Sequence, residues 1–388
     1  MKIEKYFAKG YSLQMILHLL RTNWNINISR RTFSRILNML NLKRKNINES
    51  PYAELVTAIL LELEGSGFNL GYRAMWKRLK KVYNLTAKQE TIRILLGGID
   101  PDGVEGRRRY RLKRRVYSAP GPNHIWHADN HDKLKRFGFP IYGCIDGFSK
   151  KVIWLRVSRT NNNPNVIGSY YLTAIEKHGF LPTLVRADNG TEATLMEDMH
   201  MALRYHHDDE CAGIKSFIRG KSTRNQRIES YWRQFRQHMG EFYMQLFKTM
   251  EEENLFRADS PLHIECLRYC FGKLIQDDME LTRKEWNEHR IRKQNNRDVA
   301  GGIPDEMFKW PENYGAVRCE KQLDLESLQC LKEYVEEPIL ISPVFNELVK
   351  LLDIRISEVV TAEDAFNLYL TILRAISSEL GEVDVLLL

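Results

Sequence analysis

Apolar residues recur at helical spacing over the first hundred residues of the chain. Residues 11–45 are predicted to form two short helices, the second beginning at Ser29, a favourable N-cap residue. One face of this second helix is apolar and consists of Phe33, Ile36, Leu37 and Leu40. The opposite face carries side chains that could reach DNA: Arg30, Arg31, Arg35 and Asn38. This pattern is typical of a helix-turn-helix, whose second helix lies in the major groove, although a solvated amphipathic helix would also show it.

The helical spacing continues to residue 96. Residues 52–64 form one predicted helix, and a second follows the apolar positions Tyr72, Met75, Leu79 and Tyr83. A third helix is expected after Thr86, with an apolar face of Ile92, Leu95 and Leu96. Together these helices could form a second helix-turn-helix.

A strongly basic run follows. Seven cations occupy nine positions: Arg107, Arg108, Arg109, Arg111, Lys113, Arg114 and Arg115. Such a run is expected to bind phosphate groups, to act as a nuclear-import signal, or both, and a solvated linker is the alternative. Proline and glycine at 119–122 then mark a boundary.

Beyond this boundary the pattern changes to alternating strands and helices. Strands are predicted at 125–129, 141–146, 151–157 and 183–188, and helices at 164–178, 191–205 and 224–247. We assign Asp146 to the turn of the hairpin rather than to chemistry. Three strands followed by helix, strand and helix predict an α/β layer with a mixed sheet. The rest of the chain, from about residue 260, reads as mostly helical.

Composition and charge narrow the function classes. A chain of 388 residues, 43% hydrophobic and 28% charged, is expected to fold into two or three domains. Its six cysteines form no Cys-x-x-Cys pair, and the pattern indicates neither secretion nor a membrane span. Residues 1–116 carry 24 Lys and Arg against 9 Asp and Glu, whereas the remainder carries 34 against 41. A basic first part joined to an acidic second part favours nucleic-acid binding by the first.

Three acids occupy distinctive positions. Asp129 and Asp188 end predicted strands, and Glu229 lies in the first turns of a predicted helix. Acids that converge at one edge of a sheet repel one another unless they bind something positive. Carboxylates with open coordination positions are typical of magnesium sites for phosphoryl chemistry. The histidines around Asp129, at 124, 127 and 131, could support such a site or serve the structure.

Residues 119–247 resemble the catalytic core of retroviral integrases and related DDE transposases, which share the ribonuclease H-like fold. The resemblance lies in four motifs taken in order: Trp126-His127-Ala128-Asp129, Ile145-Asp146-Gly147-Phe148-Ser149-Lys150, Asp188-Asn189-Gly190, and Ser222-Thr223-Arg224-Asn225-Gln226-Arg227-Ile228-Glu229. Residues 286–308 are similar to the segment that follows such cores. The resemblance covers about half of the chain, and the four motifs together are more specific than any one.

The resemblance implies roles for individual residues. Asp129, Asp188 and Glu229 would bind two Mg²⁺ or Mn²⁺ ions and carry catalysis, and His127, Asn189 and Asn225 are candidates to support them. Arg233 and Arg236 follow Glu229 on one predicted helical face and could hold DNA phosphates, unless they form a surface salt-bridge ladder. The sequence departs from retroviral integrases in having no zinc module before the core. The acidic and histidine-rich residues 206–210 lengthen the chain between Asp188 and Glu229. This cluster could bind metal, but we favour a solvated loop.

The sequence therefore predicts a DDE-type integrase or transposase with a ribonuclease H-like core, an all-α helix-turn-helix region before it and a helical region after it. The expected domains are 1–50, 51–116 with the basic arm, 117–250 as the core, 251–320 as its helical extension, and 321–388 as an acidic tail. Double-stranded DNA is the expected partner, a homo-oligomer the expected assembly, and the nucleus the expected location in a eukaryote, or otherwise the cytoplasm and nucleoid. The alternatives are an element-derived DNA-binding protein without catalytic activity and a nuclease of the same fold that acts on RNA.

Overall fold

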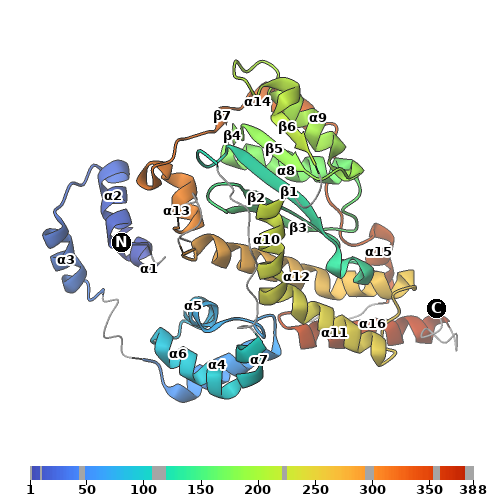
Figure 1. The fold of residues 1–388 in the computed structure, drawn as a ribbon. Helices are drawn as coiled ribbons and strands as arrows, with labels where there is room; N and C mark the ends of the chain where they lie inside the picture. Colours follow the sequence, from blue (N-terminus) through green and yellow to red (C-terminus); the bar gives the residue numbers. More distant parts are fainter. Residues whose placement is uncertain are drawn as a thin grey trace. The chain divides into compact units, whose positions relative to one another are not determined.

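The computed structural model describes residues 2–8, 11–42, 49–106, 119–220, 225–292, 301–352 and 359–380. The chain forms two compact units (Figure 1). One unit consists of Met1–Leu61 and Gly71–Arg109, and the other of Glu62–Leu70 and Tyr110–Leu388. The finer division into five domains stays a prediction. The basic run 107–115 lies outside the described residues.

The first helices of the N-terminal unit are α1 (Lys2–Ala8), α2 (Leu13–Trp24) and α3 (Arg30–Met39). The apolar spacing predicted α2 and α3, whereas α1 was not predicted. Ser12 and Ser29 are the N-caps of α2 and α3, and each side-chain oxygen accepts a backbone N–H at 3.1 Å. Asn25 takes a left-handed conformation after α2 and ends it. Phe33 and Leu37 are buried, so the apolar face of α3 packs inward as predicted.

Three further helices and a short one follow: α4 (Tyr52–Glu64), α5 (Tyr72–Val82), α6 (Gln89–Ile99) and α7 (Pro101–Gly106). Met75 and Leu79 of α5 are buried, as are Ile92 and Leu96 of α6, and the two helices pack together. The prediction that the third helix begins directly after Thr86 is wrong by two residues. The backbone of Thr86 pairs with Ser50 instead, through hydrogen bonds of 2.7 and 3.0 Å, so α6 starts at Gln89.

A mixed five-stranded sheet organises the second unit. Its strands are β1 (Ile125–His131), β2 (Ile141–Asp146), β3 (Val152–Val157), β5 (Leu184–Ala187) and β6 (Phe217–Arg219). They lie in the order β3-β2-β1-β5-β6, with β1 antiparallel to β2 and parallel to β5. The predicted mixed sheet is thus observed. Strand β6 was not predicted. The predicted end of the first strand at Asp129 is wrong, because the pairing of β1 with β2 continues to His131.

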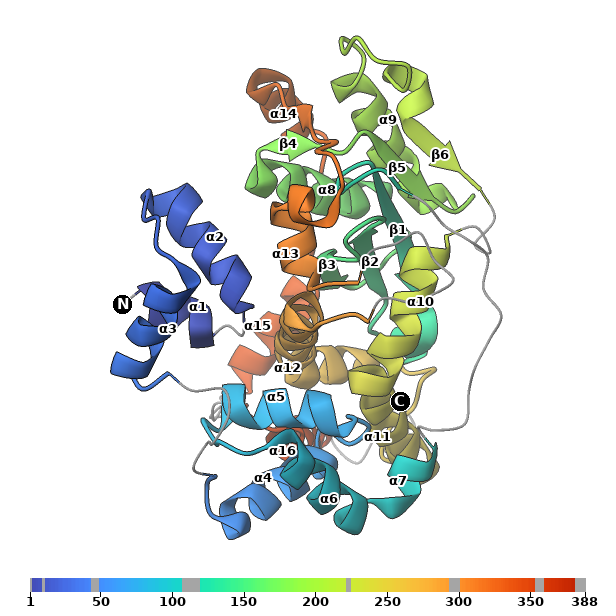
Figure 2. The ribbon, with the colours of Figure 1, turned by 60° about the vertical axis from the view of Figure 1, so that its left-hand side comes forward.

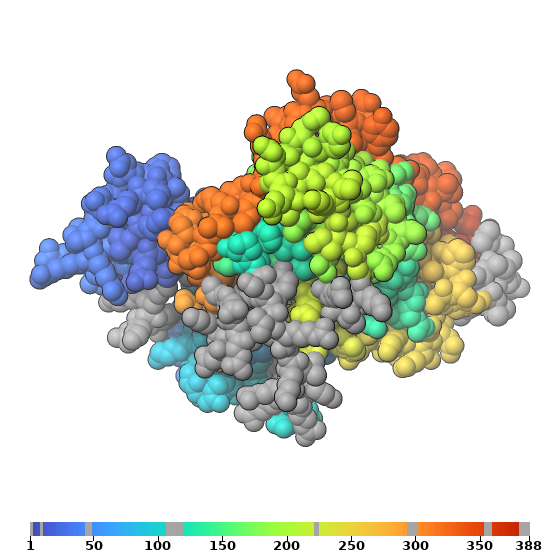
Figure 3. Space-filling model, turned by 45° about the horizontal axis from the view of Figure 1, so that its top comes forward, coloured from blue at the N-terminus to red at the C-terminus, as the bar shows by residue number. Residues whose placement is uncertain are grey.

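Helices cover both faces of this sheet (Figure 2). On one face lie α8 (Pro164–His178), α9 (Thr194–Leu203) and α14 (Leu325–Lys332). On the other lie α10 (Gln226–Phe235), α11 (Glu241–Glu252), α12 (Pro261–Glu288), α15 (Pro343–Leu351) and α16 (Ala362–Leu380). Figure 3 shows α14, in orange, beside the yellow-green surface of α9, with which it packs. Two hydrophobic clusters, one per face, make the core.

Shorter elements complete the second unit. Strands β4 (Phe180–Leu181) and β7 (Lys321–Gln322) pair with each other, and α13 (Pro304–Lys309) follows α12. Single helical turns lie at η1 (Asp132–Phe137), η2 (Thr191–Ala193), η3 (Gly213–Ser216) and η6 (Pro311–Tyr314). Among the described residues, every helix is too short or too polar to cross a bilayer.

The predicted helix 224–247 is not one regular α-helix. Its N-cap is Asn225, and a π-helical turn at Arg236–Gly240 separates α10 from α11. The turn changes the helical register, so residues after 235 no longer follow the spacing of those before it.

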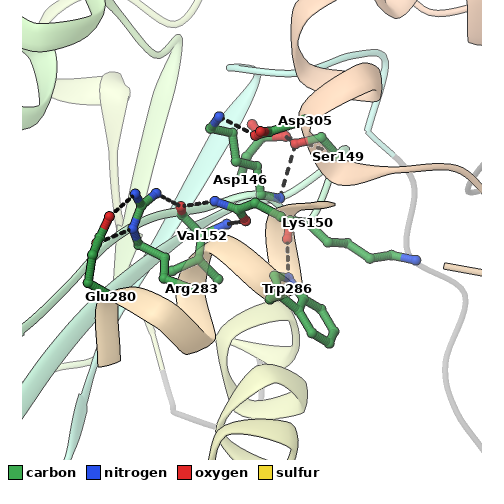
Figure 4. Close-up of polar contacts among 10 residues, drawn as sticks. Asp146, Ser149, Lys150, Val152, Glu280, Arg283, Trp286 and Asp305 are labelled. Atoms are coloured by element: carbon green, nitrogen blue, oxygen red, sulfur yellow. Dashed lines mark hydrogen bonds and ion pairs between the residues drawn. The ribbon is translucent and has the colours of Figure 1, made fainter. Parts of the chain in front are cut away.

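Helix α12 covers the edge strand β3 with polar side chains. The amide of Asn287 accepts from Val152 N at 2.8 Å and donates to Val152 O at 2.9 Å, as a neighbouring strand would. Figure 4 shows Arg283 and Trp286 on the same side of the hairpin, with the Trp286 indole donating to Lys150 O at 2.7 Å. Further along, Gln276 pairs with Val157 N and Leu155 O. These contacts satisfy backbone groups that an exposed edge would offer to other chains.

Candidate active site

The three acids singled out in the sequence come from neighbouring elements of the second unit. Asp129 lies in β1, Asp188 directly follows β5, and Glu229 lies in the first turn of α10. Because β1 and β5 are parallel neighbours, their carboxyl ends meet at one edge of the sheet. Helix α10 packs on β1 and β2 and carries Glu229 to the same place.

The electrostatics show that the three carboxylates are close. Burial, then the charges of Glu229 and Asp188, raise the pKa of Asp129 to about 7, although a hydrogen bond from Trp232 opposes the shift. Burial and the charge of Asp188 likewise raise the pKa of Glu229. Within the described residues, neither Lys, Arg nor His forms an ion pair with any of the three acids. The described residues therefore leave their negative charges unneutralised.

A buried asparagine joins the start of α10 to β1. Asn225 is 1% exposed, its Nδ2 donates to Ala128 O at 2.8 Å, and its Oδ1 lies 2.7 Å from His127 Nδ1. Burial lowers the pKa of His127 to about 3, so this imidazole is neutral and can donate to the amide oxygen. These bonds fix Glu229, one helical turn on, relative to Asp129. His127 and Asn225 thus lie where a supporting role was predicted for them.

The sequence analysis missed Trp232. Its indole Nε1 donates to Asp129 Oδ2 at 3.0 Å, and the side chain is 5% exposed. His131 stacks on the indole, with ring centroids 4.8 Å apart, so His131 contacts the site through Trp232. A signal was present in the sequence, because Trp232 lies three residues after Glu229 and shares its side of the helix.

A fourth acid, Glu192, was also missed. Asn130 Nδ2 donates to Glu192 Oε1 at 2.8 Å. Burial first, and then the charge of the neighbouring Asp188, raise the pKa of Glu192. The position of Glu192, four residues after Asp188 and beyond a glycine turn, was the available signal.

The remaining predicted residues of the core lie at the surface. Asn189 and Arg233 are exposed and, among the described residues, have no side-chain hydrogen bond. The salt-bridge ladder, which was the alternative to DNA contact for Arg233 and Arg236, does not form with Glu229 among the described residues. Arg236 pairs instead with Glu241, at 2.5 Å, across the π-helical turn.

Two other sequence assignments concern acids outside the site. In the loop 206–210, Asp209 accepts two hydrogen bonds from Arg204 and pairs with Lys321 at 3.1 Å. Burial opposes ionisation of Asp209, but these contacts lower its pKa to about 2. Asp146 is fully buried and accepts from Asn123 N, Ser149 N and Ser149 Oγ, each at 2.7 Å. Asp209 therefore holds the loop, and Asp146 holds the hairpin turn.

The three carboxylates are suitable ligands for divalent metal ions, although their positions do not match a complete metal-binding site. No group of three or more His, Cys, Asp or Glu side chains in the described residues has the geometry of a metal centre. Carboxylate oxygens are nevertheless the donor set that Mg²⁺ and Mn²⁺ prefer. Asp129, Asp188 and Glu229 are the residues that would hold such ions.

A second candidate surface lies on α3. The side chains of Arg30, Arg31, Arg35 and Asn38 are all exposed, as a DNA-reading face requires. On α6, by contrast, Glu90 pairs with Arg93 at 2.5 Å, and Ile94 is 61% exposed. The exposed face of α3 is therefore basic, whereas that of α6 is balanced in charge and partly apolar.

The comparisons with known proteins bear on the fold of this unit. Residues 116–308 match the family model described as "Integrase core domain". This segment is an integrase core domain. Its mixed sheet with helices on both faces is a ribonuclease H-like core, which confirms the fold expected from the sequence motifs. Helical regions before and after the integrase core domain are confirmed as well.

One similar solved structure is the simian T-cell lymphotropic virus intasome in complex with the PP2A regulatory subunit B56 gamma. The similarity has 15% sequence identity and a TM-score of 0.32, and it covers 66% of this chain and 75% of that one. No curated protein matches the chain.

Proposed function

We propose that this protein is a DDE-type enzyme that cleaves DNA strands and joins them. The observation that carries the proposal is the convergence of Asp129, Asp188 and Glu229 on one edge of an integrase core domain, where they are buried in part and have no cationic partner among the described residues. Holding three repelling carboxylates together destabilises the fold, so a ligand of opposite charge is the expected reason for the arrangement.

In this proposal the three carboxylates bind two Mg²⁺ or Mn²⁺ ions. When bound, the ions would activate water or a DNA 3′ hydroxyl and stabilise the leaving oxygen of an in-line displacement at phosphorus. Asn225 holds the start of α10 against β1, and thereby sets Glu229 opposite Asp129. The exposed Arg233, one turn after Glu229, is placed to contact a DNA phosphate. The displacement needs no covalent enzyme intermediate.

Double-stranded DNA is the proposed substrate and binding partner. The exposed basic face of α3 would read base edges, and the run 107–115 would contact phosphates. Joining requires two DNA ends at one place, so we propose a homo-oligomer. Nuclear location in a eukaryote stays a prediction from the basic run.

The test uses the full-length protein in nicking and strand-transfer assays over a panel of candidate terminal repeats, with Mg²⁺ or Mn²⁺. We expect Asp129→Asn, Asp188→Asn and Glu229→Gln each to abolish both reactions, with DNA affinity unchanged. Asp208→Asn, which changes an exposed loop acid, is the matched control and should retain activity. Wild-type activity in any one of the three variants would refute the catalytic assignment. DNA binding without cleavage by the wild type would favour the non-catalytic alternative.

A further inference from the structure

The indole of Trp232 fills a space that the sheet leaves open beside Asp129. Gly143 of β2 is the direct partner of Asp129 in the antiparallel ladder, so the two positions face the same side. A Cβ at Gly143 would lie 2.6 Å from Cη2 and 3.2 Å from Cζ2 of Trp232. Contacts below 3.0 Å are not tolerated, so only glycine at 143 leaves room for the indole as it lies.

The indole is held firmly in this space. His131 stacks on it at 4.8 Å with an interplanar angle of 27°, and Phe235 meets it edge-on at 5.8 Å. With the ring fixed, Nε1 has one direction in which to donate, and that direction leads to Asp129 Oδ2 at 3.0 Å. The contact spans 103 positions of the chain, from β1 to α10.

The chemistry of this donor suits a metal ligand. An indole N–H is a donor only and carries no net charge, so it orients one carboxylate oxygen and leaves the negative charge of Asp129 in place. A lysine or arginine at this position would instead neutralise the acid. The bond also connects the strand that carries Asp129 to the helix that carries Glu229, and so limits how far the two acids can move apart.

We propose that Trp232 is a positioning residue, which orients the Asp129 carboxylate for divalent metal binding, and that Gly143 provides the space this role requires. The inference rests on the proposed function, because it assumes that Asp129 binds a metal ion. Hydrogen-bonding partners of metal ligands contribute to metal affinity by fixing the orientation of the ligand.

The first test measures metal binding by the full-length protein, through the shift of its melting temperature with Mn²⁺ or Mg²⁺ concentration and through calorimetry. Trp232→Phe keeps an aromatic ring and removes the N–H. We expect this variant to bind the ion about tenfold or more weakly, the range seen for lost partners of metal ligands.

Trp154→Phe is the matched control. Trp154 is also 5% exposed and lies on β3 of the same sheet, but its Nε1 has no hydrogen-bond partner in the described residues. Loss of an indole there should lower the melting temperature without changing metal affinity. A weakened affinity in both variants would mean that the loss at Trp232 is only structural, and would overturn the inference.

The second test uses Gly143→Ala alone and with Trp232→Phe. The added methyl group should displace the indole and weaken metal binding as Trp232→Phe does. Because phenylalanine lacks the outer ring atoms that the methyl group would meet, the two effects should be less than additive. Fully additive effects of the two substitutions would refute the positioning role. The same holds if the wild type binds metal and Trp232→Phe binds it with unchanged affinity. A wild type that binds no metal would instead refute the proposed metal site, and the inference with it.

Discussion

Replacing Asp129 by asparagine should stabilise the metal-free protein, even though it should abolish activity. The pKa of Asp129 rises from 3.8 to about 7 on folding, mainly because of burial and the charge of Glu229. The folded chain therefore binds this proton more tightly than the unfolded chain does. As a result, the contribution of Asp129 to the free energy of unfolding is most favourable below pH about 4 and is lost as the pH rises to about 7.

The size of the effect follows from the shift. A change of roughly three pKa units corresponds to about 4 kcal/mol at pH 8, as an upper bound. Asparagine has the same shape, carries no charge, and keeps an oxygen that can accept from Trp232 Nε1. For a domain of this size, 1 kcal/mol changes the melting temperature by about 2–4 °C, so Asp129→Asn should raise it by on the order of 10 °C.

The assay is thermal unfolding of the full-length protein in EDTA between pH 4 and pH 8. The melting temperature of Asp129→Asn should exceed that of the wild type at pH 8, and the difference should shrink towards pH 4. Mg²⁺ or Mn²⁺ at pH 8 should raise the wild type towards the variant and leave the variant unchanged. The exposed-loop variant Asp208→Asn should follow the wild type throughout. Equal melting temperatures at pH 8, or a difference that does not depend on pH, would refute charge repulsion at this site.

Three further predictions concern other contacts. Asn225→Ala removes the hydrogen bonds of Asn225 to Ala128 O and to the His127 imidazole, and should lower the free energy of unfolding by about 1–3 kcal/mol, measured by denaturant titration. Asn287→Ala should destabilise by a similar amount because it removes the side-chain acceptor of Val152 N and leaves Arg283 as the remaining side-chain donor to Val152 O. Light scattering should then detect association through the uncovered edge of β3. When DNA sequences that bind are selected from random duplexes, Arg31→Ala and Arg35→Ala should change the selected motif, because each base contact contributes about 1–3 kcal/mol to the binding free energy. Arg93→Ala on α6 should leave the motif unchanged. The reverse outcome would make α6 the helix that reads the bases.

Local patterns in the sequence were sufficient for the helices of the N-terminal unit and for the class of the core. Helix α3 forms where Phe33 and Leu37 repeat at helical spacing after the N-cap Ser29, and both properties depend on neighbours only a few positions away. The acids at 129, 188 and 229 could be selected for the same reason, because each lies in or beside an element that its neighbours define. The closeness of Asp129 and Asp188 then follows from the parallel pairing of β1 with β5, and that of Glu229 from the packing of α10 on β1.

The tertiary structure decided the contacts that complete the site. Trp232 meets Asp129 because α10 lies on the face of the sheet where Gly143 has no side chain, and neither the packing face nor the ladder register is local information. The same holds for Glu192, whose link to Asp188 depends on the course of the turn between them. The π-helical turn at Arg236–Gly240 interrupts a stretch whose sequence spacing predicts one regular helix. The sequence thus determined which residues are candidate metal ligands. Packing between residues about a hundred positions apart determined which side chains hold those candidate ligands in place.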